Sequence, residues 1–194
     1  MKAAKRVLSF ILENGPCSRS SIIASTGLSS SRVSEVTAQL LKNGVLSESG
    51  GSKTQRGRRP ALLDLDPGWG LTLGIGLHGG VLSAGIATPR GKALESVSID
   101  AGGAPLLLAA RELSLGLLKN CCLEPSGLLG AGLCAGEDIL ATLPKNPSLL
   151  GHPLFLEDSG AYAEYSLAYL SLPIDPGSLY IYGCARVVRA FIYE

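Results

Sequence analysis

The sequence has few of the residues that build metal sites and disulfide frameworks. Its 194 residues include only two histidines, His78 and His152, and five cysteines, at positions 17, 121, 122, 134 and 184. No CxxC pair occurs, and no spacing of His and Cys suits zinc. Both histidines stand alone among glycines and prolines, so we interpret them as structural. We expect no metal, no cofactor, and reduced thiols in a cytoplasmic protein.

The sequence also lacks a convincing membrane segment. Residues 67–89 carry no charge, but they contain seven glycines and a proline at each end, which suits hairpins better than a membrane helix. The N-terminal apolar stretch is interrupted at Ser9 and Glu13, and no small-residue cleavage site follows it. We therefore expect neither a signal peptide nor a membrane partner.

Charge is scarce overall but unevenly distributed. The formal net charge is +1, yet residues 1–60 carry ten Lys and Arg against three Glu, and residues 61–194 carry seven basic against thirteen acidic residues. A basic segment of net charge +7 thus precedes one of −6. This layout is typical of a nucleic-acid-binding head on a regulatory or catalytic body. Because 46% of the residues are hydrophobic, the chain can bury a core.

Three helices are predicted in the first 45 residues. The first has an apolar stripe at Ala4, Val7, Leu8 and Ile11 and stops at Gly15-Pro16. Ser18 can cap a second helix that buries Ile22 and Ile23 and ends at Gly27. The third has apolar or small positions at 33, 36, 37, 40 and 41 and a glycine past its end.

This arrangement matches a helix-turn-helix, whose second helix enters the DNA major groove. Gly44 is followed by the segment VLSES, a basic stretch and the alternating segment ALLDLD. This pattern predicts two strands on either side of a basic loop, and such a pair after a recognition helix is typical of a winged helix. Periodicity alone leaves open a three-helix packing unit with a solvated polar face. The predicted DNA contacts are Arg19, Ser29, Ser30, Ser31, Arg32, Ser34, Glu35, Lys53, Gln55, Arg56, Arg58 and Arg59.

The run GPCSRSSIIASTGLSSSRVSEVTAQLLKNGVLSESG, followed by RGRRPALLDLDP, resembles the DNA-binding head of bacterial ROK-family transcription regulators. These sugar-responsive repressors are related to glucokinase-type sugar kinases. The resemblance covers about the first third of the chain. It implies a winged helix-turn-helix domain over residues 1–66 and a partial actin-like domain over residues 67–194.

In the second part, the spacing Gly74-x-Gly76-x-x-Gly79 follows an apparent strand, which raises a dinucleotide-binding site as an alternative. That fingerprint requires a helix after the last glycine. Strand-like stretches separated by the turn TPRGK follow instead, so a three-stranded meander is the better interpretation. It resembles the first three strands of the actin-like fold, with Gly76 at the position of the family's acid.

Further elements follow the meander. Leu106, Ala110, Leu113 and Leu117 predict a helix, and SGLLGAGLCAGEDIL predicts a buried strand and a loop. PLFLED predicts a strand, SGAYAEYSLAYLSL a helix, and SLYIYGCARVVRAFIYE one or two final strands. Beta elements that alternate with helices indicate an α/β sheet. The fold class is therefore α/β overall, with an N-terminal all-α winged helix-turn-helix domain and a single actin-like, ribonuclease H-like lobe.

The resemblance places a catalytic motif at LEDSG. In the family's kinases an Asp in this motif is the general base, and Asp158 matches it, whereas Leu156, Glu157 and Gly160 depart from the pattern. Glu157 and Asp158 are the candidate ligand-binding pair, and Asp158 is catalytic only if kinase activity survives. A carboxylate before a helix is also an N-cap, which we favour. The family's second phosphate loop and zinc motif have no counterpart.

The sequence therefore predicts a DNA-binding transcriptional regulator, a repressor of sugar-related genes, and no enzyme. Its expected partners are double-stranded DNA, a second copy of the chain and a sugar effector. Two alternatives stay open: a ROK-type sugar kinase that carries a DNA-binding head, and a non-enzymatic module for sugar sensing or dimerisation.

Overall fold

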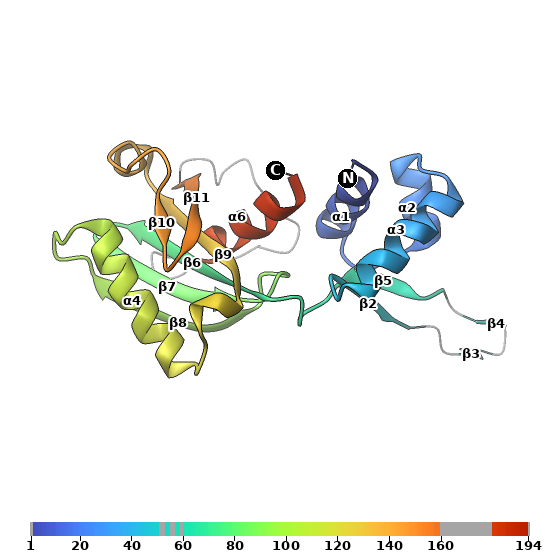
Figure 1. Ribbon diagram of the computed structural model, residues 1–194, viewed down its shortest axis with the longest axis horizontal. Helices are drawn as coiled ribbons and strands as arrows, with labels where there is room; N and C mark the ends of the chain where they lie inside the picture. Colours follow the sequence, from blue (N-terminus) through green and yellow to red (C-terminus); the bar gives the residue numbers. More distant parts are fainter. Residues whose placement is uncertain (1, 51–52, 55–56, 59, 160–179, 194) are drawn as a thin grey trace. The chain divides into compact units, whose positions relative to one another are not determined.

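The computed structural model describes residues 2–50, 53–54, 57–58, 60–159 and 180–193. The chain divides into two compact units, which span Met1–Trp69 and Gly70–Ile192. Each unit has its own buried apolar residues. Figure 1 shows the helices and strands of both. Within the described residues, no helix is both long enough and apolar enough to cross a membrane.

The first unit contains the three predicted helices: α1 (Lys2–Asn14), α2 (Arg19–Thr26) and α3 (Ser30–Lys42). Each buries most of its expected stripe, although Ala4, Leu40 and Leu41 are only partly buried. Val7, Ile11, Ile22 and Val33 are fully buried, because a period near 3.6 residues places them on one face of their helices. Ile23 is only partly buried.

The first unit also contains a small sheet, and two of its strands lie in the predicted segments VLSES and ALLDLD. Strands β1 (Cys17–Ser18), β5 (Leu62–Leu65) and β2 (Leu46–Ser49) lie side by side in that order, and β5 is antiparallel to both neighbours. Leu63 and Leu65 are buried while Leu62 is exposed, as the alternation predicted. Between β2 and β5 in sequence, β3 (Lys53–Thr54) pairs antiparallel with β4 (Gly57–Arg58).

The second unit is built on a six-stranded sheet. Its strands are β6 (Leu71–His78), β7 (Val81–Ala87), β8 (Ala93–Asp100), β9 (Leu128–Ala135), β10 (Ser148–Leu149) and β11 (His152–Asp158), in the order β10-β11-β9-β6-β7-β8. The predicted meander β6-β7-β8 is confirmed, since both of its strand pairs are antiparallel. Strands β9 and β11 run parallel to β6 and to each other.

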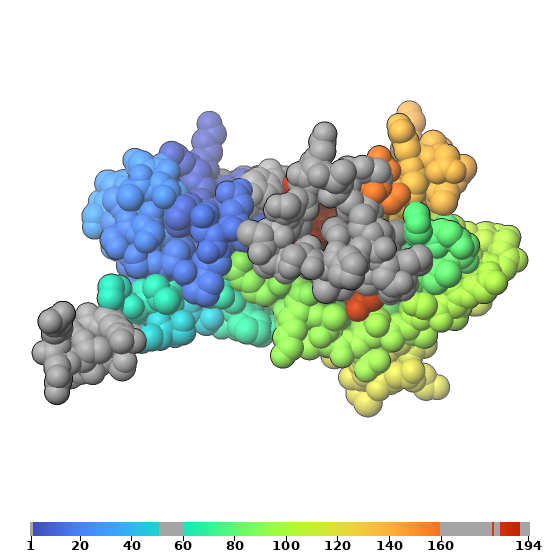
Figure 2. Space-filling model, turned by 180° about the vertical axis from the view of Figure 1, so that it is seen from behind, coloured from blue at the N-terminus to red at the C-terminus, as the bar shows by residue number. Residues whose placement is uncertain are grey.

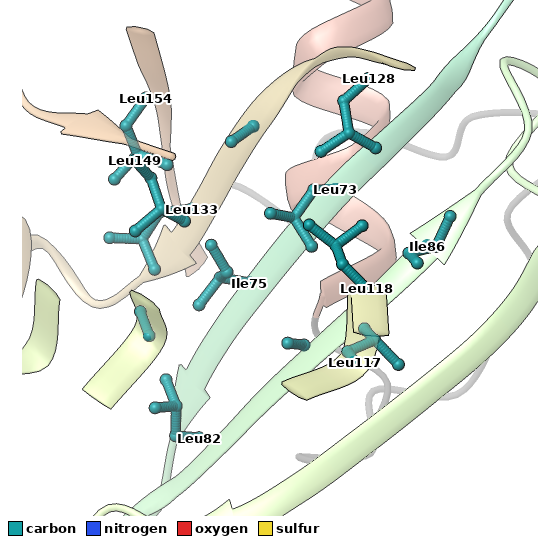
Figure 3. Packing of buried hydrophobic residues seen from close by; sticks show 13 residues of the cluster. Leu73, Ile75, Leu82, Ile86, Leu117, Leu118, Leu128, Leu133, Leu149 and Leu154 are labelled. Atoms are coloured by element: carbon teal, nitrogen blue, oxygen red, sulfur yellow. The ribbon is translucent and has the colours of Figure 1, made fainter. Parts of the chain in front are cut away.

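One face of this sheet is covered by α4 (Leu106–Asn120), the helix that leucine spacing predicted. Leu117 and Leu118 of α4 join a cluster that contains Leu73 and Ile75 of β6 and Leu133 of β9 (Figure 3). Their mutual burial supplies the hydrophobic stabilisation of this layer. The unit also contains two short elements: a 3₁₀ turn, Pro125–Gly127, and α5 (Glu137–Leu140).

The prediction of one or two final strands is wrong, because Tyr180–Tyr193 forms a helix, α6. Cys184, Val187 and Val188 are all buried, at the i, i+3, i+4 spacing of one helix face. Val, Ile and Tyr are enriched in strands, and this enrichment favoured the wrong element. The predicted helix SGAYAEYSLAYLSL lies outside the described residues except for Ser159.

Helix α6 packs on the sheet face opposite α4, where glycines allow an unusually close approach. A Cβ atom on Gly132 of β9 would lie 2.0 Å from the carbonyl oxygen of Gly183, and one on Gly74 of β6 would lie 1.8 Å from that of Tyr180. A Cβ on Gly85 of β7 would lie 2.1 Å from the Tyr180 ring. Because they lack a Cβ atom, these strand glycines let α6 pack directly on the backbone of the sheet.

Candidate nucleic-acid interface

The turn between α2 and α3 has the geometry of a helix-turn-helix. Ser18 caps α2, and its hydroxyl accepts a hydrogen bond from the Ser21 N–H at 3.1 Å. Gly27 ends α2 in the left-handed region at φ +64°, where glycine has no steric penalty. Ser29 then caps α3 by accepting from the Arg32 N–H at 3.3 Å. Gly27 and Ser29 thus fix the two ends of the turn.

Helix α3 has one buried face and one exposed face. Val33, Val36 and Thr37 are buried and hold the helix against the unit. The predicted groove-contacting residues of α3 are all exposed: Ser30, Ser31, Arg32, Ser34 and Glu35. The exposed start of α3 therefore combines short polar side chains, which permit close approach, with a long basic one.

Arg32 is held by an ion pair that costs little to break. Its Nη1 lies 2.7 Å from the Glu35 Oε2, one turn along the helix, and both side chains are about half exposed. Exposed pairs of this kind contribute roughly 0–1 kcal/mol, so the guanidinium can exchange Glu35 for a nucleic-acid oxygen.

Arg19 lies differently from the other predicted contacts. Its Nη1 lies 2.7 Å from the Glu48 Oε1, and its Nε donates to the Thr37 Oγ1 at 3.3 Å. One guanidinium therefore joins the start of α2 to α3 and to β2. Sequence reasoning missed this link, since nothing in the residue spacing pairs positions 19 and 48.

The basic loop corresponds to the β3–β4 segment. Lys53 pairs in register with Arg58, and Thr54 with Gly57, so the two strands form a hairpin that carries basic residues on both strands. Three predicted contacts of this loop, Gln55, Arg56 and Arg59, lie outside the described residues. The register alone is typical of a wing that follows a recognition helix.

The positions of the kinase motif lie in the second unit, at the end of β11. Leu156, Glu157 and Asp158 pair in register with Leu133, Cys134 and Ala135 of β9. The Glu157 Oε2 lies 3.4 Å from the Arg186 Nε, and its Oε1 lies 3.9 Å from the Arg189 Nη1. This carboxylate is thus held by two cations of α6. The predicted helix that Asp158 was expected to cap lies outside the described residues except for Ser159.

The glycines of the first turn and His152 have structural positions. Gly79 and Gly80 both have positive φ and close the β6–β7 hairpin between His78 and Val81, as a two-residue turn requires. Strand β7 follows them in place of a helix, which excludes the dinucleotide-binding interpretation. His152 is structural, since its Nε2 lies 2.8 Å from the Pro125 carbonyl oxygen. The described residues contain no group of three or more His, Cys, Asp or Glu that could hold a metal ion.

In the described residues, the three helices with their small sheet fit a winged helix-turn-helix, and the second unit fits an actin-like α/β lobe. Comparisons with known proteins agree with this interpretation. The chain is 30% identical over 131 residues to a xylose repressor of Caldicellulosiruptor bescii, and 29% identical over 141 residues to the xylose repressor of Bacillus subtilis. These matches cover 66% and 67% of this chain but 33% and 35% of the relatives. The chain therefore spans about a third of the length of these relatives.

The structural comparison gives the same fold. A ROK family transcriptional regulator, a homologue of the E. coli MLC protein, matches with a TM-score of 0.53 and 20% identity, over 80% of this chain and 44% of that one. A search against family models found no match. The chain is thus similar in sequence to xylose repressors and in fold to a ROK family transcriptional regulator, which supports the predicted resemblance and confirms the fold class.

Proposed function

We propose that the protein is a sequence-specific DNA-binding transcriptional regulator that represses sugar-related genes. The observation that carries the proposal is the exposed polar face of α3, held by the buried Val33 and Val36 and followed by a basic hairpin. A net charge of +7 over residues 1–60 supplies the attraction to phosphates. The relatives named as xylose repressors support the same function.

The residues divide into two roles. Ser30, Ser31, Arg32, Ser34 and Glu35 face the major groove and read base edges, with Ser29 at the helix start. Lys53, Gln55, Arg56, Arg58 and Arg59 of the wing contact phosphates and the minor groove. Arg19, which is bonded to Thr37 and Glu48, positions α3 relative to the wing strands.

The second unit serves regulation rather than catalysis in this proposal. Phosphoryl transfer needs a metal, a phosphate cradle and a base positioned together. Glu157 is instead neutralised by Arg186 and Arg189, and the glycines of the first turn close a hairpin. A sugar effector, a pentose by analogy with the xylose repressors, is the ligand to test first. A protein that represses chromosomal genes acts in the cytoplasm, where we expect this one.

Capture of genomic DNA fragments by the purified chain tests the DNA-binding function. Recovered fragments should share an inverted repeat, and Arg32→Ala should reduce their enrichment. Recovery of random sequence with no dependence on α3 would reject sequence-specific reading.

A thermal-shift screen separates the regulator from its alternatives. A sugar present at about 100 times its Kd adds about 2.7 kcal/mol to the free energy of unfolding, whereas a kinase also responds to ATP. Consumption of ATP and sugar that disappears in Asp158→Asn would favour the kinase. A response to sugar with no DNA binding would favour the sensing module.

A further inference from the structure

Strand β8 is the edge of the second unit's sheet among the described strands, and β7 is its neighbour (Figure 1). Its register with β7 is regular over residues 95–100, and just beyond them the Ala101 N–H donates to the Gly80 carbonyl oxygen at 2.8 Å. Because bonded pairs alternate along an antiparallel ladder, only every second residue of β8 bonds to β7. The backbone N–H and C=O groups of Ser96 and Ser98 therefore point away from β7, where a further strand can pair with them.

An apolar groove lies beside this edge, between β8 and α4. It has a volume of about 430 Å³, and it is lined by Val97 and Ile99 of the strand and by Leu108 and Leu113 of the helix. Ile99 is 41% exposed and Leu108 is 51% exposed, so a partner that covers them removes apolar surface from water. In Figure 2 the light green surface that contains β8 is open to solvent.

An open edge strand with an apolar groove beside it is suited to an extended peptide. A peptide that adds to such an edge forms backbone hydrogen bonds with it, and its side chains alternate between the two faces of the enlarged sheet. Ile99 pairs in register with Leu82 and Val97 with Ala84, and both partners belong to the buried cluster that includes α4. Every second side chain of an added strand therefore points to the face that carries the groove. Those positions of the peptide should be apolar.

The charges around the groove indicate a second property of its partner. Asp100 and Glu112 line the groove, and no described residue of the lining is basic. The Asp100 Oδ1 accepts a hydrogen bond from the Gly102 N–H at 3.0 Å, and Glu112 forms no ion pair within the described residues. Glu95 lies on the same face of β8 as the strand residues of the groove. This apolar site thus carries negative charge that is complementary to a basic partner.

We propose that β8 and this groove bind an extended segment of another protein that has apolar residues at alternate positions and a lysine or arginine. The segment adds to the sheet as a strand beside β8, its apolar side chains fill the groove, and its cation lies against Glu112. A second β8 strand fits less well, since residues 95–100 carry two carboxylates and no cation. The site is additional to the proposed DNA binding, which uses other residues.

Selection of short random peptides displayed on phage, with the whole chain as bait, tests the composition of the partner. Selected peptides should have alternating apolar residues and be enriched in Lys and Arg. For such a peptide, Ile99→Lys and Leu108→Glu should each weaken binding about tenfold or more, as measured by fluorescence anisotropy. Leu115→Glu is the matched control, since Leu115 is a 36% exposed leucine of α4 that does not line this groove. Selection of no such peptide, or equal binding by all variants, would overturn the proposal.

A charge exchange tests the contact with Glu112. Glu112→Lys should weaken binding of the selected basic peptide. A peptide in which Glu replaces the Lys or Arg should bind this variant better than it binds the wild type, because the opposite charges again meet. The same preference of both peptides for the wild type would reject the charge complementarity.

Hydrogen exchange of the whole chain tests whether the peptide adds as a strand. The bound peptide should slow exchange of the Ser96 and Ser98 amides, because these groups point away from β7 and become bonded only in the complex. Unchanged exchange with the peptide bound would reject strand addition. Slower exchange at the same two amides as the protein concentration rises without peptide would identify a second copy as the occupant and overturn the proposal.

Discussion

Arg19 and Glu48 are joined by an ion pair of 2.7 Å between residues 29 positions apart, and the same guanidinium donates to the Thr37 hydroxyl. The pair connects the first residue of α2 with β2, the strand that leads into the basic hairpin. Thr37 belongs to the buried face of α3. One side chain therefore links α2 and α3 to the strand that leads into the basic hairpin.

Arg19→Ala should weaken DNA binding without changing its salt dependence. A residue that only positions α3 makes no contact with a phosphate, so its loss leaves the slope of log Kobs against log salt unchanged. A residue that binds a phosphate releases a counterion and makes this slope steeper by about 0.9. Because both side chains are about one-third exposed, loss of the pair should lower the free energy of unfolding by only about 0.5–1 kcal/mol. Fluorescence anisotropy over a salt series and urea unfolding measure the two effects.

The reversed pair, Arg19→Glu with Glu48→Arg, is the control for this role. It should recover most of the affinity lost by Arg19→Glu alone, because the bridge can form again with opposite polarity. A decrease of the salt slope by about one in Arg19→Ala would instead identify Arg19 as a phosphate contact.

Arg32→Ala should reduce affinity for a captured DNA site by about 1–3 kcal/mol while the stability changes by less than about 0.5 kcal/mol. The reason is that Arg32 is exposed and bonded only weakly to Glu35. Arg111→Ala, which removes an exposed arginine from α4 of the second unit, is the matched control. Equal losses in the two variants would indicate a general charge effect rather than reading by α3.

Gly132→Ala should destabilise the second unit by about 1–3 kcal/mol or more, because the added Cβ meets the Gly183 carbonyl oxygen at 2.0 Å and two backbones would have to separate. Gly116→Ala in α4 is the contrast: its Cβ meets nothing within 4 Å, and helix propensity predicts a gain of about 0.5–1 kcal/mol. Urea unfolding followed by circular dichroism measures both. Equal tolerance of the two substitutions would refute the packing of α6 on the strand glycines.

The thiols should differ strongly in reactivity. Burial raises the pKa of Cys184 to about 12, although its hydrogen bonds to Thr72 and Ala87 act in the opposite direction. Burial and the nearby Glu157 also raise the pKa of Cys134. Because only the thiolate reacts, a maleimide at pH 8 should label the exposed Cys122 quickly and these two only after unfolding. Mass spectrometry of the labelled protein checks the order.

The raised pKa of Cys184 also predicts a pH dependence of stability. A thiol whose pKa is higher in the folded protein favours the folded state fully below its ordinary value of 9.0, and this contribution is lost as pH rises from there through about 12. The free energy of unfolding should therefore fall above pH 9, and less steeply in Cys184→Ala. Identical profiles for the two proteins would assign the alkaline loss to other groups.

Local sequence signals predicted the first unit well. The stripes of α1 and α3, the Ser18 cap and the Gly27 turn depend on neighbouring residues, and all appear in the structure. The β6-β7-β8 meander also follows from turns of local sequence. Such elements can be predicted from the sequence because the residues that determine them are close together along the chain.

Contacts between distant residues could not be predicted in this way. The pairing of Arg19 with Glu48 and of Glu157 with Arg186 depends on how separate elements pack. Helix α6 was mistaken for strands because its Val and Tyr residues favour strands, whereas burial against Gly74 and Gly132 decides its form. Of the glycines that suggested a phosphate or dinucleotide loop, Gly79 and Gly80 form a hairpin turn, and Gly74 lies in the sheet surface that α6 contacts.

The most direct test of the account is the salt dependence of duplex DNA binding by the wild type and by a variant with Lys53, Arg56, Arg58 and Arg59 all changed to Ala. We predict that log Kobs falls linearly with log salt for the wild type. The slope of the variant should be smaller by up to about 0.9 for each basic side chain that binds a phosphate in the wild type. Equal slopes for the two proteins, or no binding by the wild type at low salt, would contradict the assignment of residues 1–66 as a winged DNA-binding domain.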